Sequence, residues 1–126
     1  MKNYLISISL FIIMVILLFY ADNSFKSLCN DIIIACDTME ETAKSGDLDE
    51  LFQPSMDLFN MIQSNSTIAA IYINHMDYDI VLNEALKLNV YVEQGDPSEA
   101  SASLHLLKYM AYQLKHILVP TFRNIF

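Results

Sequence analysis

Apolar residues follow two different patterns along this chain. Residues 5–21 form an unbroken apolar run without a charged residue, Gly or Pro. From Phe25 onward the apolar residues recur every three or four positions, which is the spacing of amphipathic α-helices. Alternating patterns typical of strands are absent from the sequence. The chain is therefore predicted to be all-α, with a transmembrane helix at residues 1–22 and a helical domain at residues 23–126.

The periodic part divides into four predicted helices, at about residues 24–45, 48–74, 78–94 and 97–118. Because the connections between them are short, neighbouring helices should be antiparallel, which predicts an up-down four-helix bundle of two stacked hairpins. A tetratricopeptide-type array is an alternative, but the period and the aromatic signature differ. Pro54 should kink the second helix or delay its start. The predicted core stripes comprise Phe25, Leu28, Ile32, Ala35, Met39; Leu51, Leu58, Ile62, Ala69, Ile73; Val81, Ala85, Leu88, Val92; and Leu104, Leu107, Ala111, Leu114, Leu118.

The only two glycines introduce the same short phrase, Gly-Asp-x-x-Glu, at residues 46–50 and 95–99. Such a Gly ends a helix in the left-handed conformation, the Asp caps the next helix, and the Glu completes a capping box. Pro97 would occupy the first helical position, where its missing N–H costs nothing. Each phrase predicts a tight turn between two helices, and Asp77 could cap the helix that follows a break at Asn74.

The apolar run is about 25 Å long as a helix, slightly short for a bilayer crossing. Tyr4 and Tyr20 bracket it, where aromatic rings favour the membrane interfaces. A cleaved signal peptide is the alternative, but cuts after Ala21 or Ser24 would place Phe19 or Asp22 where a small residue is needed. We therefore expect residues 5–21 to stay in the lipid bilayer.

Charge predicts both the orientation and the kind of partner. Lys2 precedes the apolar run without any acid, which favours a cytoplasmic N-terminus and an extracytoplasmic domain in the cell membrane. All fifteen acids follow the run, against six of the seven bases, so the domain together with Asp22 at its start carries a net charge of −9. An acidic surface is repelled by phosphate backbones, so no nucleic acid partner is expected. Solubility beside an anionic membrane also explains the acidity.

Two cysteines, Cys29 and Cys36, are seven residues apart. On one helix they share a face but lie about 10 Å apart, too far to form a disulfide with each other. Buried thiols acting as small hydrophobic groups are expected, with intermolecular disulfides as the alternative. No further ligands for a metal site lie nearby in the sequence.

Several polar and aromatic residues are candidates for interaction. His75 and Asp79 could share a helical face, as two metal ligands would, but capping and turn formation is the favoured explanation of the cluster. Residues 63–67 are polar and could line a ligand-binding notch, form a solvated turn of helix, or break it. His105 and His116 are too far apart to act on one atom, and surface positions are expected. The candidate interaction residues are His75, Asp77, Asp79, Tyr109, Tyr112, Phe122, Ile125 and Phe126.

The tyrosines suit either the edge of the core or an interface. The apolar C-terminal tail, residues 119–126, could fold back on the bundle or dock on a membrane partner. No sequence motif for a nucleophile, phosphate loop or zinc site is present. We expect no enzymatic activity, no catalytic residues, no cofactor and no metal.

Residues 75–126 resemble an uncharacterised family of short membrane-anchored helical proteins of spore-forming Gram-positive bacteria, domain of unknown function 4363. The resemblance is carried by His75-Met76-Asp77-Tyr78-Asp79, the helix through Tyr91, Gly95-Asp96, Ala100, His116-Ile117 and Asn124-Ile125-Phe126. It implies a bacterial envelope setting and no assigned activity. Pro54 departs from the pattern expected for the second helix.

Two functions remain open from the sequence. The favoured one is a non-enzymatic accessory or scaffold subunit of a bacterial envelope complex, bound to a membrane-protein partner through a bundle face or the tail. The alternative is an extracytoplasmic sensor whose bundle binds a small ligand. With so few residues before the anchor, a signal would have to pass through a partner, which favours the accessory role. No oligomeric state is predicted.

Overall fold

The computed structural model describes the backbone of residues 1–125 and the side chains of residues 1–70 and 73–116. Five α-helices and one 3-10 turn account for nearly all of this backbone, and residues 1–125 contain no strand. The elements in chain order are α1 (Lys2–Lys44), η1 (Asp49–Leu51), α2 (Phe52–Ser64), α3 (Ser66–Tyr72), α4 (His75–Gln94) and α5 (Pro97–Ile125).

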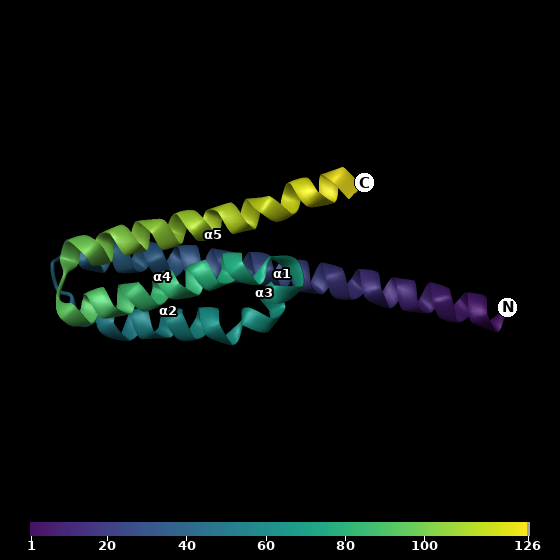
Figure 1. The fold of residues 1–126 in the computed structure, drawn as a ribbon, viewed down its shortest axis with the longest axis horizontal. Coiled ribbons are helices and arrows are strands. Elements are labelled where there is room, and N and C mark those ends of the chain that lie inside the picture. Colours follow the sequence, from purple (N-terminus) through teal and green to yellow (C-terminus); the bar gives the residue numbers. More distant parts are fainter. Residues whose placement is uncertain (126) are drawn as a thin grey trace.

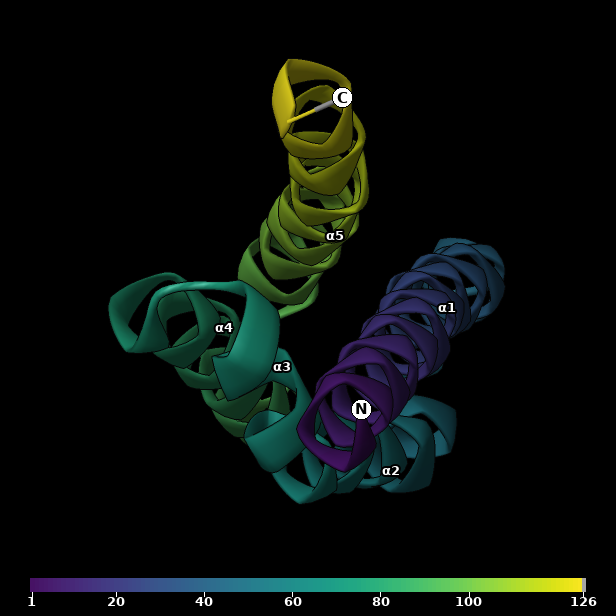
Figure 2. The ribbon, with the colours of Figure 1, turned by 90° about the vertical axis from the view of Figure 1, so that its right-hand side faces the viewer.

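Four antiparallel helical segments form the bundle: α1, α2 with its extension α3, α4 and α5 (Figures 1 and 2). Neighbouring helices run in opposite directions, as the predicted up-down topology requires. α1 packs mainly against α5, α4 packs against both α5 and α2, and α1 packs less extensively against α2. The predicted fold class is therefore confirmed, and one side of the bundle, between α1 and α2, is less tightly closed.

α1 continues without interruption from the apolar run into the bundle. It spans 43 residues, and its first half projects alone from what we call the proximal end of the bundle (Figure 1). The sequence predicted a separate bundle helix starting near residue 24, but no break occurs there. Asp22 and Lys26 form an i,i+4 ion pair of 3.0 Å that supports the helix at this point. Because no Gly or Pro interrupts residues 2–44, the polar Asp22-Asn23-Ser24 step is not enough to end the helix.

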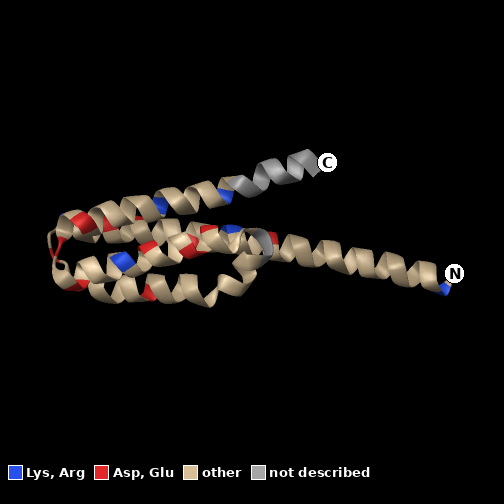
Figure 3. Ribbon diagram, in the orientation of Figure 1, with Lys and Arg blue, Asp and Glu red and all other residues tan. Residues whose placement is uncertain are grey.

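Within the described residues, α1 is the one helix long and apolar enough to cross a membrane. The side chains of its apolar segment are exposed, whereas those on one face beyond Asp22 enter the bundle core. Charge follows the same division: the projecting part carries Lys2 at its start and no other charged residue before Asp22 (Figure 3).

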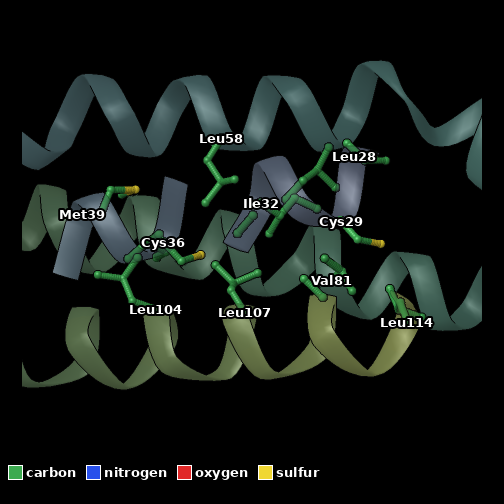
Figure 4. Packing of buried hydrophobic residues seen from close by; sticks show 14 of the residues in the cluster. Leu28, Cys29, Ile32, Cys36, Met39, Leu58, Val81, Leu104, Leu107 and Leu114 are labelled. Carbon is green, nitrogen blue, oxygen red and sulfur yellow. The ribbon is translucent and has the colours of Figure 1, made fainter. Parts of the chain in front are cut away.

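The core is built from the predicted stripes. Phe25, Ile32, Leu58, Leu88 and Leu104 are each at most 2% exposed, and side chains from α1, α2 and α5 converge between the helices (Figure 4). Ala35 and Ile73 are only partly buried at the edge of this core. The predicted core position Leu118 lies outside the described side chains.

Both glycines adopt the predicted left-handed conformation, with φ of +83° at Gly46 and +73° at Gly95. At the second turn the Gly95 N–H donates to the Val92 carbonyl and the Asp96 N–H donates to the Tyr91 carbonyl, which is a Schellman motif. The Asp96 carboxylate then caps α5 by accepting from Glu99 N–H at 3.2 Å. At the first turn the carboxylate of Asp47 accepts from Asp49 N–H instead, and a 3-10 turn precedes α2.

Further boundaries differ from the predicted ones, and α5 ends at Ile125 instead of near residue 118. The second predicted helix is divided at Asn65, so the local break that was one alternative for residues 63–67 is present. Pro54 lies in the first turn of α2, where its missing N–H is tolerated, and the helix starts late as one alternative predicted. The cap of α4 is Asn74, whose Oδ1 accepts from Met76 N–H at 3.2 Å, so Asp77 lies inside the helix rather than at its cap.

Candidate interaction surfaces

The seam between α1 and α5 is held by polar contacts that join distant parts of the chain. Lys108 Nζ lies 2.9 Å from Asp37 Oδ1 and 3.1 Å from Glu40 Oε2. His105 Nδ1 lies 3.1 Å from the other oxygen of Glu40. The hydrogen bonds that Lys108 donates to Asp37 and to Glu40 raise the pKa of Lys108. The side chain of Glu40 is 16% exposed, so Lys108 supplies the positive charge that this largely buried carboxylate needs.

About two turns nearer the proximal end, Lys115 Nζ donates to Asn30 Oδ1 at 2.7 Å. Two lysines of the acidic domain therefore lie on α5 and face α1. With Asp37 and the imidazole of His105 beside them, the seam carries charges of both signs, whereas the domain as a whole is strongly acidic.

A groove of about 560 Å³ opens on the outer side of this seam. We call it the tyrosine groove, and its lining consists of Ile33, Asp37, His105, Lys108, Tyr109 and Tyr112. Tyr109 is 61% exposed and Tyr112 is 54% exposed, so neither ring is part of the core. The ring of Tyr112 packs edge-on against His116, with 4.3 Å between centroids. Exposed tyrosines beside an aliphatic side chain are typical of protein-binding surfaces.

Ile34 lies next to this groove, on the outward crest of α1, and is 62% exposed. Its neighbour Ile33 turns inward and packs against the core. Sequence reasoning did not single out Ile34, although one signal was present: it is a large aliphatic residue outside the stripe that starts at Phe25. An apolar side chain that faces solvent beside a groove is a candidate contact residue.

A second, longer groove follows the looser contact between α1 and α2. It consists of two cavities of about 390 and 320 Å³ that share Asp31 and Met61. Its lining on α1 extends from Tyr20 to Thr42, so the groove opens at the proximal end, where the apolar segment leaves the bundle. We call it the α1–α2 groove, and the sequence did not predict it, because it arises from the spacing between helices.

The lining of the α1–α2 groove combines small polar residues with apolar ones. Ser24, Ser27 and Thr38 come from α1, and Leu58 and Met61 come from α2. Asp31 and Asp57 are the charged side chains among the lining residues. Asn65, at the break between α2 and α3, also lines the groove, so one residue of the predicted polar notch faces a cavity. Small side chains let another helix approach closely, and Met adapts to the shape of a partner.

The remaining candidate residues lie apart from both grooves. His75, Asp77 and Asp79 are exposed in the first turns of α4 and line neither cavity, so His75 and Asp79 share a helix without forming part of either groove. Among the described residues no group of three potential ligands is positioned to hold a metal ion. Phe122, Ile125 and Phe126 lie outside the described side chains.

Both thiols are buried in the core and free, as one of the two alternatives predicted. Burial raises the pKa of Cys29 from 9.0 to about 11. Burial, together with the carboxylates of Glu40 and Asp37, raises the pKa of Cys36 to about 12. A thiol held in its neutral form is a poor nucleophile and a poor metal ligand, so these cysteines act as packing residues.

These features define a class: a small all-α protein with one long apolar N-terminal helix that continues into a four-helix bundle. The family model described as "Domain of unknown function (DUF4363)" matches residues 19–125, and the chain belongs to this family. The match begins near the end of the apolar segment and covers the whole bundle. Comparison with curated proteins and with solved structures gave no significant match.

Proposed function

We propose that the protein is a single-pass membrane protein and a non-enzymatic accessory or scaffold subunit of a bacterial envelope complex. In this proposal residues 5–21 cross the bilayer, the N-terminus is cytoplasmic, and the bundle stands on the outer face. A transmembrane helix of a partner protein would lie beside the anchor and continue into the α1–α2 groove.

The observation that carries the proposal is the continuity of α1. A helix of 43 residues without a break holds the bundle in line with its apolar segment rather than on a flexible linker. The groove then starts at Tyr20, which marks the end of the apolar run. A helix that leaves the bilayer beside the anchor would enter this groove without changing direction.

The charges of the groove indicate the kind of partner. Asp31 and Asp57 favour a helix that carries Lys or Arg among apolar and small residues. A second copy of the same bundle would bring further acids to this groove, because its net charge is −9. The partner proposed here is therefore a different protein.

Site-specific photo-crosslinking in the native cells tests the proposal. A photoreactive amino acid at Ser27 or Thr38, both exposed in the groove, should give one crosslinked integral membrane protein. The same probe at Asn83 or Lys87, exposed on α4, is the matched control. Equal crosslinking at all four positions, or none, would contradict the proposed docking site.

The membrane topology needs its own measurement. Alkaline carbonate should leave the full chain in the membrane fraction, and a reporter fused after Phe126 should be active only outside the cytoplasm. Release by carbonate would contradict the anchor. Activity of a cytoplasmic reporter would contradict the orientation while leaving the anchor intact.

A further inference from the structure

The tyrosine groove and the apolar crest beside it lie at the same level along the bundle. Ile33 lines the groove, and Ile34, the next residue, projects from the crest. Successive residues of an α-helix are turned by about 100° and separated by about 1.5 Å along the axis. A protruding side chain and a recess therefore lie next to each other around the surface of α1, with almost no difference in height.

The wall of the tyrosine groove that α5 forms lies at the same height along the bundle as Ile33 and Ile34. Lys108 contacts Asp37, and Lys115 contacts Asn30, so the part of α5 between these lysines lies against the part of α1 between Asn30 and Asp37. Tyr112 belongs to this part of α5. The recess that Ile34 would need on another molecule is thus formed by Ile33 and Tyr112.

We propose that two copies of the chain associate side by side through this face, with Ile34 of each copy entering the tyrosine groove of the other. The two-fold axis would run parallel to α1. A contact of this kind is isologous, since the same protrusion and the same recess are used on both copies.

The inference rests on the membrane anchor of the proposed function. Two copies anchored in one bilayer with the same orientation have their bundles at the same height. Only surfaces whose complementary parts share a height can then meet in a symmetric pair, and Ile34 and its recess satisfy this condition. The α1–α2 groove remains free for the proposed partner, because it opens on the other side of the crest of α1.

Charge opposes a second copy less at this face than at the α1–α2 groove, whose charged lining residues are Asp31 and Asp57. The groove lining contains one carboxylate, Asp37, one ammonium group, Lys108, and the imidazole of His105. Two bundles that each carry −9 repel one another, but the balanced charges of this groove add no further repulsion at the contact. The seam lysine Lys115 lies one turn away from the groove and adds to this effect.

The test is crosslinking of the full chain in membranes. The variant Ile34→Cys, treated with a short bis-maleimide, should give a covalent dimer as the main product. Asn60→Cys, exposed on α2, is the control and should stay monomeric. The native thiols give little background, because Cys29 and Cys36 are buried with raised pKa values.

A second pair of variants tests the interface without a crosslinker. Ile34→Asp should weaken self-association in detergent by at least about tenfold, because an unpaired carboxylate would be buried at the contact. Leu86→Asp, at an exposed position of α4, should leave it unchanged. Both changes are at exposed positions, and circular dichroism of each variant verifies that the bundle is folded.

The possible outcomes separate this inference from the proposed function. Monomeric Ile34→Cys, or crosslinking of Ile34→Cys to a different protein, would overturn the two-fold contact while carbonate-resistant membrane association upheld the anchor. Release by carbonate would instead show that residues 5–21 do not anchor the chain. Two copies would then not be held at the same height.

Discussion

The hydroxyl group of Tyr78, on α4, donates a hydrogen bond to the carbonyl of Ile62, in the last turn of α2. A carbonyl in that turn is one of those that a helix end leaves without an intrahelical partner. Because α2 ends at Ser64 and α3 starts again at Ser66, the break would otherwise expose the Ile62 carbonyl to the core. Tyr78 is 2% exposed and thus satisfies a buried acceptor that the break creates.

The first prediction concerns this bond. Tyr78→Phe should lower the free energy of unfolding by about 1–3 kcal/mol, since the buried carbonyl loses its donor while packing is kept. Urea denaturation followed by circular dichroism measures the change. Tyr109→Phe removes the hydroxyl of an exposed tyrosine and should have little effect. Equal losses for the two variants would show that the contact with Ile62 contributes nothing specific.

The second prediction concerns pH. The pKa of Tyr78 is raised by burial from 10.0 to about 12, and those of Cys29 and Cys36 are raised from 9.0 to about 11 and about 12. The folded state therefore holds these protons more tightly than the unfolded state does. Their contribution to stability is complete below about pH 9 and is lost as pH rises towards 12.

The urea midpoint should accordingly fall between about pH 9 and 12, and Cys36→Ala should make the fall shallower. At neutral pH a thiol reagent should modify Cys29 and Cys36 slowly in the folded protein and quickly in denaturant. Rapid labelling of the folded protein would show that the thiols are accessible and would contradict the packing described for α1.

The third prediction concerns the turn between α4 and α5. Gly95→Ala should cost about 1–2 kcal/mol, because an L-residue is strained in the left-handed conformation. No atom lies within 4 Å of the position that the new Cβ would occupy, so the cost is one of backbone conformation alone. Gly46 is equally open, and Gly46→Ala should cost a similar amount in the same denaturation assay. If only one of the two variants lost stability, strain of the left-handed conformation would not explain both turns.

Local signals predicted most of the fold. The repeated Gly-Asp-x-x-Glu phrase located both tight turns, because left-handed backbone conformation depends mainly on the residue itself. The stripes from Phe25 and from Val81 located the core for a similar reason, since a helical face of constant spacing has to be buried. The predicted start of a bundle helix near residue 24 is not observed, because the three polar residues at 22–24 weaken a helix without ending it.

The surfaces were harder to predict, since they depend on distances between helices. Tyr109 and Tyr112 were recognised as candidates from their residue type, and both are exposed. Their relation to Ile33 and Ile34 requires the register between α1 and α5, which Lys108 and Lys115 define through contacts some 70 to 85 residues away in sequence. No local pattern carries this information.

The last prediction tests that register. Lys108→Met keeps the length of the side chain but removes the ammonium group between Asp37 and Glu40. Glu40 is mostly buried, so its carboxylate would lose its nearest permanent positive charge, and the melting temperature should fall. Lys87→Met is the control, because Lys87 is exposed and lies 3.8 Å from Glu84. Lys87→Met should change the melting temperature little.

The double variant Lys108→Met with Glu40→Gln should recover part of the lost stability, since the uncompensated charge is then removed together with its partner. If the double variant were as unstable as the sum of the two single changes, Lys108 and Glu40 would be energetically independent. The α1–α5 register would then not depend on the ion pair between Lys108 and Glu40, and neither would the height of the tyrosine groove relative to Ile34.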